Sequence, residues 1–383
     1  MTTPAGAGPG RPFTGRRAPN TGPRESRDQT RTKGFEVASN SEILALSHAL
    51  TIARTPGVPA RPNPRVGAVV LDDVGAVVGV GYHRGAGSAH AEVDALVSAG
   101  DRARGATVVV SLEPCNHTGR TPPCAQALID AGVRRVVFAQ GDPNPVAAGG
   151  AATLAAAGIE VEGGVLADEA ALINEEWTFA MQERRPFVTW KLATTLDGRS
   201  AAADGTSQWI TGPAARADVH RLRARCDAVL VGTGTIAADD PRLTVRDPDD
   251  VPLARDEQPL RVVMGTRDLD SQAKVFDDTA DTTVLATHDP KHALSTLFTR
   301  HRQHVWLEGG PTLAAAFLRD GLVDAVVAYV APAFLGAGRH AVADLGVTSI
   351  DEIRRFELVE ATRVGGDVRL ILRRETAMTR GAG

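Results

Sequence analysis

Cysteine and long apolar runs are both scarce in this 383-residue chain. Its three cysteines, Cys115, Cys124 and Cys226, are an odd number and too few for a disulfide scaffold, so they indicate thiols of a reducing compartment. No run approaches the 18 consecutive apolar residues of a membrane span, and the N-terminus lacks the apolar core of a secretory signal. We therefore expect a cytoplasmic protein with no membrane partner.

A strong net charge is absent too. The 42 Lys and Arg residues nearly balance 46 Asp and Glu residues, for a formal net charge of -4. A protein that binds nucleic acid carries a basic surface, so nucleic acid is not an expected partner. Hydrophobic residues make up 43% and charged residues 23%, as in ordinary globular proteins, and the length predicts about two domains.

The two ends of the chain are expected to lie outside the folded domains. Residues 1–40 are crowded with Gly, Pro, Thr and Arg and carry almost no aliphatic side chains. Such a segment cannot bury enough apolar surface to offset its ordering entropy, so we predict a disordered extension. Residues 377–383 are predicted to be a C-terminal tail.

The remaining sequence predicts two domains of the α/β class, with residues 41–186 as the first and 187–376 as the second, because strands alternate with helices in both. The first begins with a helix that Ser41 caps, followed by a hairpin that turns at 72–75. Further elements expected in the first domain are helices at 90–98, 124–131 and 167–181 and strands at 106–112, 135–139 and 158–165. The second begins at Phe187 with the apolar pattern FVTWKLATTLDG. Its further expected elements are strands at 228–231, 260–264, 283–286, 305–307, 325–330 and 368–372 and helices at 213–225 and 312–319.

A histidine, a glutamate and two cysteines stand in an order typical of a catalytic zinc site. His90-Ala91-Glu92 opens an expected helix, and Cys115 and Cys124 follow the next strand. One imidazole and two thiolates fill three of zinc's four tetrahedral positions and leave one for water, whose pKa the metal lowers towards 7. Glu92 can then carry the proton of that water to a departing amine.

The spacing of the cysteines departs from the usual zinc-deaminase signature, in which two residues separate them. Here eight residues, NHTGRTPP, lie between Cys115 and Cys124, and we expect them to loop out between the two ligands. The alternative is a pair of unrelated core cysteines and a solvent-exposed histidine. The four residues together favour zinc, whereas Cys226 is expected to be a small buried hydrophobe.

Four segments of the first domain occur in a characteristic order: PNPRVGAVV, GYHRGAGSAHAEVDAL, SLEPCNHTGRTPPC and DPNP. Together they resemble the deaminase half of the bifunctional riboflavin-biosynthesis deaminase/reductase family. The resemblance implies a cytidine-deaminase-like fold of three α/β/α layers, with zinc on His90, Cys115 and Cys124 and with Glu92 as the proton shuttle. The residues that it implies for binding a pyrimidine with a ribose 5-phosphate, each of which could also be a plain turn or surface residue, are Asn63, His83, His117 and Arg120.

The second domain lacks the G-x-G-x-x-G fingerprint, so a standard dinucleotide-binding fold is not supported. Instead, VWLEGGPTLAAAFL predicts a buried strand, a turn from Glu308 to Pro311 and a helix whose N-terminal N–H groups could bind a phosphate. A plain strand-turn-helix would look similar. The glycine pair of VGTGT, Gly232 and Gly234, indicates only a tight turn.

The segments KLATTLDGRSA, SQWITG, TIAADDPRLTVR and EGGPTLAAAFL resemble the reductase half of the same family, whose fold is like that of dihydrofolate reductase. The resemblance implies contacts with NADPH at Ala193, Trp209, Thr235, Asp239, Thr266, Gly310, Pro311, Thr312, Leu313, Ala314, Ala315 and Ala316. It implies contacts with the substrate at Ser207, Arg223, Arg246 and Glu308. The two arginines suit a phosphate because a guanidinium forms bidentate bonds, although each could equally form a surface salt bridge. Lys191 is either an electrostatic partner near the sugar or a strand-end lysine.

The resemblance as a whole implies a bifunctional enzyme with a small-molecule substrate. It would deaminate 2,5-diamino-6-(ribosylamino)pyrimidin-4-one 5′-phosphate and reduce the ribosyl group to ribityl with NADPH. Two alternatives stay open: a nucleoside or nucleic-acid deaminase with an architectural second domain, and a second domain that senses NADPH without turnover. The sequence allows a homo-oligomer but does not specify one.

Overall fold

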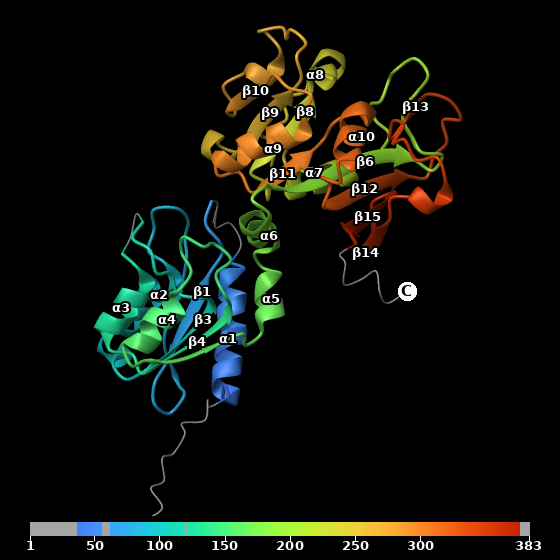
Figure 1. Ribbon diagram of the computed structural model, residues 1–383. Coiled ribbons are helices and arrows are strands. Elements are labelled where there is room, and N and C mark those ends of the chain that lie inside the picture. Colours follow the sequence, from blue (N-terminus) through green and yellow to red (C-terminus); the bar gives the residue numbers. More distant parts are fainter. Residues whose placement is uncertain (1–36, 56–61, 120–121, 376–383) are drawn as a thin grey trace, which may run out of the picture. The chain divides into compact units, whose positions relative to one another are not determined.

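The computed structural model describes residues 37–55, 62–119 and 122–375 (Figure 1). The expected extension lies outside the described residues as far as residue 36, and so does the expected tail at 377–383. Residues 37–39 are described, and the first helix begins at Asn40.

The first domain is built on a five-stranded sheet in the order β2-β1-β3-β4-β5. The hairpin β1–β2 and the pair β1–β3 are antiparallel, whereas β3, β4 and β5 run parallel. The parallel strands β3 and β4 are buried along their whole length, which explains their unbroken valine runs. In chain order the helices and strands of this domain are α1 (Asn40–Ala53), β1 (Gly67–Leu71), β2 (Val77–Tyr82), α2 (Ala91–Ala99), β3 (Thr107–Leu112), α3 (Cys124–Ala131), β4 (Arg135–Gln140), α4 (Gly150–Ala156), β5 (Glu160–Gly163), α5 (Ala167–Ala171) and α6 (Glu175–Glu183).

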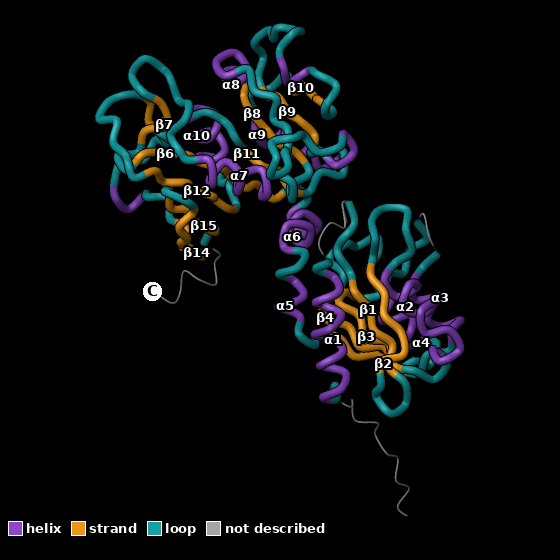
Figure 2. The backbone as a smooth tube through the Cα atoms, turned by 180° about the vertical axis from the view of Figure 1, so that it is seen from behind, coloured by secondary structure: helices purple, strands orange, loops and turns teal. Residues whose placement is uncertain are grey.

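Helices cover both faces of this sheet, which confirms the expected α/β/α layers (Figure 2). One core lies under α2, α3 and α4 and includes Ala95, Leu128 and Leu154; the other lies under α1 and includes Leu46. Helix α2 packs directly on β2. The backbones are so close that a side chain at Gly81 would clash, since its Cβ would lie 2.4 Å from the carbonyl oxygen of Ala91. Glycine on the strand therefore brings the start of α2 close to the sheet.

Three details of this domain differ from the expectation. Ser39, not Ser41, caps α1, in a capping box with Glu42, because its hydroxyl stands three residues before the glutamate. The helix expected at 167–181 is broken into α5 and α6, and Asn174 between them exchanges hydrogen bonds with the backbone of Arg65. Helix α4 was not expected, because it is short and begins with Gly150.

The second domain contains an eight-stranded sheet in the order β10-β9-β8-β11-β6-β12-β15-β14. The strands from β10 to β12 run parallel, and β15 and β14 extend the sheet antiparallel. In chain order the elements are β6 (Phe187–Thr195), β7 (Arg199–Ala201), α7 (Pro213–Arg223), β8 (Ala228–Gly232), α8 (Thr233–Asp239), β9 (Leu260–Met264), β10 (Thr282–Leu285), α9 (Pro290–Thr299), β11 (His304–Leu307), α10 (Pro311–Arg319), β12 (Ala325–Ala331), β13 (Arg339–His340), β14 (Phe356–Val364) and β15 (Asp367–Arg374).

The six strands and two helices expected with bounds in this domain are present, within two residues at each end, and the pattern that begins at Phe187 forms β6. The glycines of VGTGT do not form a simple turn: Gly232 ends β8 and caps α8. Helix α9 and the edge strand β14 were not expected, and β14 alternates exposed and half-buried residues without a clear apolar face. Within the described residues, none of the helices combines the length and the apolar character that a membrane crossing needs.

One buried cation ties the first helix to the first sheet. Arg135 in β4 is 4% exposed, and its guanidinium pairs with Glu42 of α1 at 2.8 Å and with Glu160 and Glu162 of β5. Burying a guanidinium is costly unless carboxylates compensate it, so the removal of one partner leaves an uncompensated charge.

Replacing Arg135 by alanine should therefore lower the free energy of unfolding of this domain by about 3–5 kcal/mol, the usual cost of breaking a buried ion pair. The neighbouring Arg134 is a matched control, because its side chain is 55% exposed and its nearest carboxylate oxygen lies 3.9 Å away; R134A should cost less than about 1 kcal/mol. Urea unfolding, followed by zinc release to a chromogenic chelator, measures both. Equal losses for the two variants would contradict this account.

Candidate active sites

Three elements bring the side chains of His90, Cys115 and Cys124 to one point. His90 caps the N-terminus of α2, Cys115 follows β3, and Cys124 is the first residue of α3. The Nδ1 atom of His90 lies 3.2 Å from Sγ of Cys124 and 3.5 Å from Sγ of Cys115. In a tetrahedral site with bonds of 2.0–2.3 Å, ligand atoms are about 3.5 Å apart. The three donors therefore fit a single zinc ion.

Glu92 lies beside this cluster on the first turn of α2. Its side chain is 4% exposed, and burial, the largest cause, raises its pKa to about 7. It is a neighbour of the donor cluster and not one of its members. The structure thus brings together all four residues of the constellation found in the sequence.

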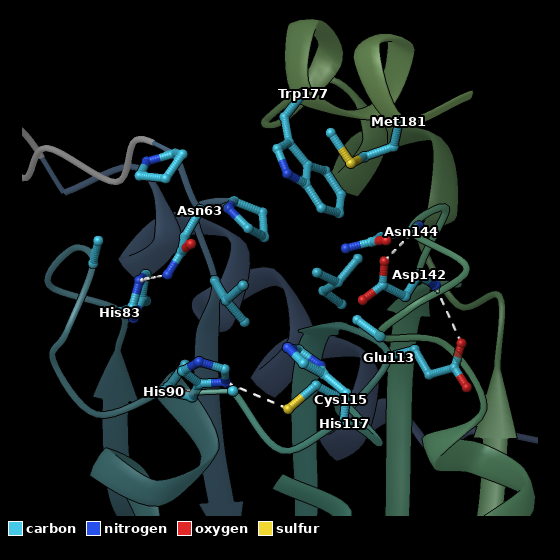
Figure 3. Close-up of a pocket in the computed structure, with 18 of the residues that line it drawn as sticks. Asn63, His83, His90, Glu113, Cys115, His117, Asp142, Asn144, Trp177 and Met181 are labelled. Carbon is cyan, nitrogen blue, oxygen red and sulfur yellow. Dashed lines mark hydrogen bonds between the residues drawn. The ribbon is translucent and has the colours of Figure 1, made fainter. Parts of the chain in front are cut away.

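A cavity of about 380 Å³ opens above the donor cluster (Figure 3). Asn63 and His83 lie on one side of it. The Nδ1–H of His83 is assigned as donor to the carbonyl oxygen of Ala89 at 3.1 Å, so its Nε2 accepts from the amide of Asn63 at 2.9 Å. This arrangement leaves the amide oxygen of Asn63 as a fixed acceptor. Burial, the largest cause, lowers the pKa of His83 and favours the neutral ring.

The insertion between the cysteines is described in part. His117 lines the cavity, and its Nδ1 atom is buried without a hydrogen-bond partner among the described residues. A buried, unpartnered ring nitrogen is costly, and a ligand group in the cavity could satisfy it. Arg120, the other expected phosphate contact on this insertion, lies outside the described residues.

In the second domain, the residues expected to contact NADPH gather mainly at the carboxyl edge of the parallel strands. Thr235 lies in α8 directly after β8, Thr266 follows β9, and the turn at Gly310 follows β11. Ligands of parallel α/β sheets bind outside this edge. The N-terminus of α10 has no side-chain cap, so its first N–H groups are available to an anion. The side chains of Ala314 and Ala315 are buried in the core, which leaves only their backbone for such a contact.

A buried ion pair occupies the same edge. Arg223 binds Glu308 through Nε at 3.1 Å and Nη2 at 2.7 Å, and Trp306 donates its indole N–H to the same carboxylate. Burial alone would raise the pKa of Glu308, but the charges of Arg223 and Lys191 outweigh it and hold that pKa at about 2. Burial lowers the pKa of Lys191, which the charge of Glu308 partly restores. Lys191 is thus a half-buried neighbour of Glu308.

The two arginines expected to contact the substrate phosphate, Arg223 and Arg246, both bind protein groups in this structure. The remaining nitrogen of Arg223, Nη1, donates to the carbonyl oxygen of Thr244 at 2.7 Å, so its guanidinium is held by protein groups. Arg246 pairs with the exposed Asp250 at 2.9 Å, as in the surface salt bridge that was the alternative.

The remaining expected residues differ in their exposure and contacts. Ser207 is half-buried, Trp209 is 68% exposed under the guanidinium of Arg216, and Ala193 lies in β6. Asp239 is exposed at the end of α8, whereas Asp240 binds Lys274 at 3.1 Å. The cofactor and substrate contacts proposed for these residues stay predictions.

Comparisons with known proteins match both domains. Residues 39–140 match the family model of the cytidine and deoxycytidylate deaminase zinc-binding region, and residues 186–370 match that of the RibD C-terminal domain. The riboflavin biosynthesis protein RibD of Mycobacterium tuberculosis is 51% identical over 330 residues, which cover 86% of this chain and 95% of the relative. That of Escherichia coli is 40% identical over 359 residues, 85% of this chain and 98% of the relative.

The chain belongs to the RibD family. Solved RibD-family structures agree with its fold. Acinetobacter baumannii RibD superposes with a TM-score of 0.81 at 39% identity, covering 88% of this chain and 99% of that chain. A Thermotoga maritima structure, named as a diaminohydroxyphosphoribosylaminopyrimidine deaminase/5-amino-6-(5-phosphoribosylamino)uracil reductase, superposes with a TM-score of 0.76 at 32% identity, covering 88% and 99%.

As a member of the RibD family, this chain is a bifunctional riboflavin-biosynthesis enzyme with a zinc-dependent deaminase domain and an NADPH-dependent reductase domain. The RibD fold also identifies cavity residues that sequence reasoning did not select. Glu113, Asp142 and Asn144 line the deaminase cavity from the carboxyl ends of β3 and β4. The sequence does show polar residues directly after the strands β3 and β4. Assigning them to one cavity, however, requires knowing that these two strands are parallel neighbours in the sheet.

The metal content tests the donor set. Replacing Cys124 by serine should reduce zinc from one atom per chain to near zero, because two remaining protein ligands do not hold zinc tightly. Cys226 supplies the control, because it is fully buried in a separate apolar core of the second domain. Elemental analysis of purified C226S should give one zinc per chain. Zinc retained by C124S, or lost from C226S, would rule out the assignment.

The Glu308–Arg223 pair gives a pH prediction. The pKa of Glu308 is about 2 in the folded chain and near the ordinary 4.5 when unfolded. A lowered folded pKa stabilises the protein above the unfolded value, and this contribution disappears as the pH falls through the folded value. The stability lost in E308Q should thus stay constant from about pH 6 to pH 8 and shrink below about pH 4.5. Denaturant unfolding of the wild-type protein and E308Q across this pH range measures the difference between their free energies of unfolding. A difference that grows as the pH falls would contradict the prediction.

Proposed function

We propose that residues 41–186 deaminate 2,5-diamino-6-(ribosylamino)pyrimidin-4-one 5′-phosphate by hydrolysis and that residues 187–376 reduce the ribosyl group of the product to ribityl. The observation that carries the proposal is the His90, Cys115 and Cys124 cluster, with Glu92 buried beside it in a cavity of about 380 Å³. A cavity of this size suits a small-molecule ligand. The name of the Thermotoga maritima neighbour supports this pair of reactions.

In the deaminase domain, His90, Cys115 and Cys124 would hold zinc, which supplies a water of lowered pKa. Glu92 takes the proton of the attacking water and delivers it to the departing amino group, so that ammonia leaves. Its position two residues after His90, in the lining of the same cavity, supports this role. The fixed amide oxygen of Asn63 orients the substrate within the cavity, together with Nδ1 of His117, which has no partner in the part of the chain that the structure describes.

In the reductase domain, the backbone N–H groups at the start of α10 and the carboxyl edge of the sheet would hold NADPH, which supplies the hydride. Glu308, kept ionised by Arg223 and Lys191, lies at the end of β11. There it can accept hydrogen bonds from the hydroxyl groups of the sugar. The protein thus contributes alignment and a fixed charge pattern.

Three further assignments complete the proposal. Deamination precedes reduction, as the resemblance to the family implies. Identical chains associate into an oligomer. The protein acts in the cytoplasm, and this location is supported by its cysteines Cys115, Cys124 and Cys226, none of which forms a disulfide within the described part of the chain.

A variant that separates the two reactions tests the proposal. Replacing Glu92 by glutamine should slow ammonia release about 10²- to 10⁴-fold, the usual contribution of a general acid–base. NADPH oxidation should be unchanged when the deaminated pyrimidine is supplied. The exposed Glu169 on α5 is the matched control, and E169Q should keep both activities.

The measurement follows ammonia and NADPH together, with zinc content determined for each protein. A zinc-loaded E92Q protein that deaminates at the wild-type rate would contradict the role of Glu92. A wild-type protein that releases ammonia from cytidine or single-stranded nucleic acid, but not from the phosphoribosyl pyrimidine, would contradict the substrate. Deamination with no NADPH consumption would contradict the second reaction.

A further inference from the structure

The two arginines expected to contact the substrate phosphate in the reductase domain differ in what their guanidinium groups have left to donate. All three nitrogens of Arg223 bind protein groups, Nε and Nη2 the carboxylate of Glu308 and Nη1 the carbonyl oxygen of Thr244. In Arg246, Nη1 donates to both carboxylate oxygens of Asp250, at 3.0 and 2.9 Å. No protein group in the described part of the chain accepts from Nε or Nη2 of Arg246. This edge can therefore bind two oxygens of a phosphate.

Arg246 lies beside the Arg223–Glu308 pair, although the three residues are far apart in the sequence. Thr244, which accepts from Arg223, stands two residues before Arg246 in the loop between α8 and β9. The backbone N–H of Arg246 donates to Nδ1 of His220 at 3.3 Å, and His220 stands three residues before Arg223 on α7. Burial, the largest cause, lowers the pKa of His220 to about 4, so its ring is neutral and can accept this bond.

The turn that contains Asp250 does not depend on the carboxylate of this residue. Asp247 closes the turn, because its Oδ1 accepts from the backbone N–H groups of Asp249 and Val251, both at 2.9 Å. Asp250 contributes its backbone N–H, and its φ of 63° is left-handed, a conformation that asparagine adopts as well as aspartate. Within the described residues, the side chain of Asp250 binds Arg246 alone.

The ion pair of Arg246 and Asp250 affects the charge of the site more than the stability of the fold. The side chain of Arg246 is 29% exposed and that of Asp250 is 75% exposed. Such a solvated pair contributes little to folding. The carboxylate nevertheless offsets the positive charge of the guanidinium, which is the charge that attracts a phosphate. The task of Asp250 is therefore to be found in the binding of anions.

We propose that Asp250 sets the affinity of the reductase domain for the phosphate of its substrate by partly neutralising Arg246. The proposal rests on the proposed function. The phosphate binds the Nε and Nη2 edge of Arg246 while Asp250 keeps Nη1, so that two anions share one guanidinium. Their repulsion weakens the binding of every phosphate group, inorganic phosphate included. The sugar then supplies the remaining affinity, through contacts such as those proposed for Glu308.

Replacing Asp250 by asparagine tests the proposal. Asparagine keeps the left-handed backbone and an acceptor for Nη1 but removes the charge. With the deaminated pyrimidine as substrate, D250N should lower the KM about 2- to 5-fold, the range for one exposed ion pair, and leave kcat unchanged. The inhibition constant of inorganic phosphate should fall by the same factor. NADPH oxidation measures these values, and calorimetric titration with ribose 5-phosphate measures the affinity without turnover.

Asp249→Asn is the matched control, because Asp249 is an exposed residue of the same turn whose side chain does not bind Arg246. It removes the same charge and should change the KM less than about 1.5-fold, since solvent screens a charge that makes no contact.

Arg246→Gln should raise the KM about 10- to 100-fold, the range for hydrogen bonds to a charged group. In this background D250N should have no effect, because no guanidinium is left to neutralise. Thermal unfolding shows whether each variant is folded. If D250N unfolds at a lower temperature than D249N, Asp250→Gly, which also adopts the left-handed conformation, replaces it in the same assays.

Four results would overturn the proposal: a KM that D250N leaves unchanged or raises, an equal fall in D249N, a fall that persists in the R246Q background, or an R246Q protein with the wild-type KM. A wild-type protein that does not oxidise NADPH with the deaminated pyrimidine would instead refute the proposed function, so the two failures are distinguishable.

Discussion

The convergence of three donor atoms on one point is the constraint on which the deaminase domain depends. His90 comes from the N-terminus of α2, Cys115 from the end of β3 and Cys124 from the N-terminus of α3. The backbone N–H of Cys124 donates to the sulfur of Cys115 at 3.3 Å, and such bonds favour the thiolate that binds a metal. The surrounding elements maintain this geometry, since α2 packs closely on β2 at Gly81 and Glu113 holds the neighbouring loop.

The two domains use electrostatics in different ways. In the deaminase cavity, Glu92 and Asp142 are carboxyl groups whose pKa values burial raises, so their protonation can respond to a ligand. In the reductase domain, Arg223 and Lys191 hold the pKa of Glu308 at about 2, so its charge is fixed. This difference follows the chemistry: hydrolysis moves protons through the protein, whereas the nicotinamide cofactor carries the hydride and needs only alignment.

The sequence was informative where one residue type has one physical use. A histidine, a glutamate and two cysteines in the right order predicted the donor cluster, and valine runs predicted the buried strands. The sequence was less informative where several residues could do the same work: both Ser39 and Ser41 carry the hydroxyl that caps a helix, and only the register with Glu42 distinguishes them. Asp142 illustrates a further limit, because its place in the cavity depends on the pairing of β3 with β4. For Arg223, the sequence could not show that Glu308 binds its guanidinium.

The central claim is that three protein ligands hold one zinc ion and leave a position open for water. X-ray absorption at the zinc edge of the full chain tests it most directly. The account predicts two sulfur atoms at about 2.3 Å and two light atoms, one of them an imidazole nitrogen, at about 2.0 Å. The contribution of the two light atoms should change when a ligand enters the cavity, because the water can be exchanged whereas the protein ligands cannot. A zinc ion coordinated by four protein ligands, whose spectrum does not change when a ligand is added, would contradict the account. A purified chain without zinc would contradict it too.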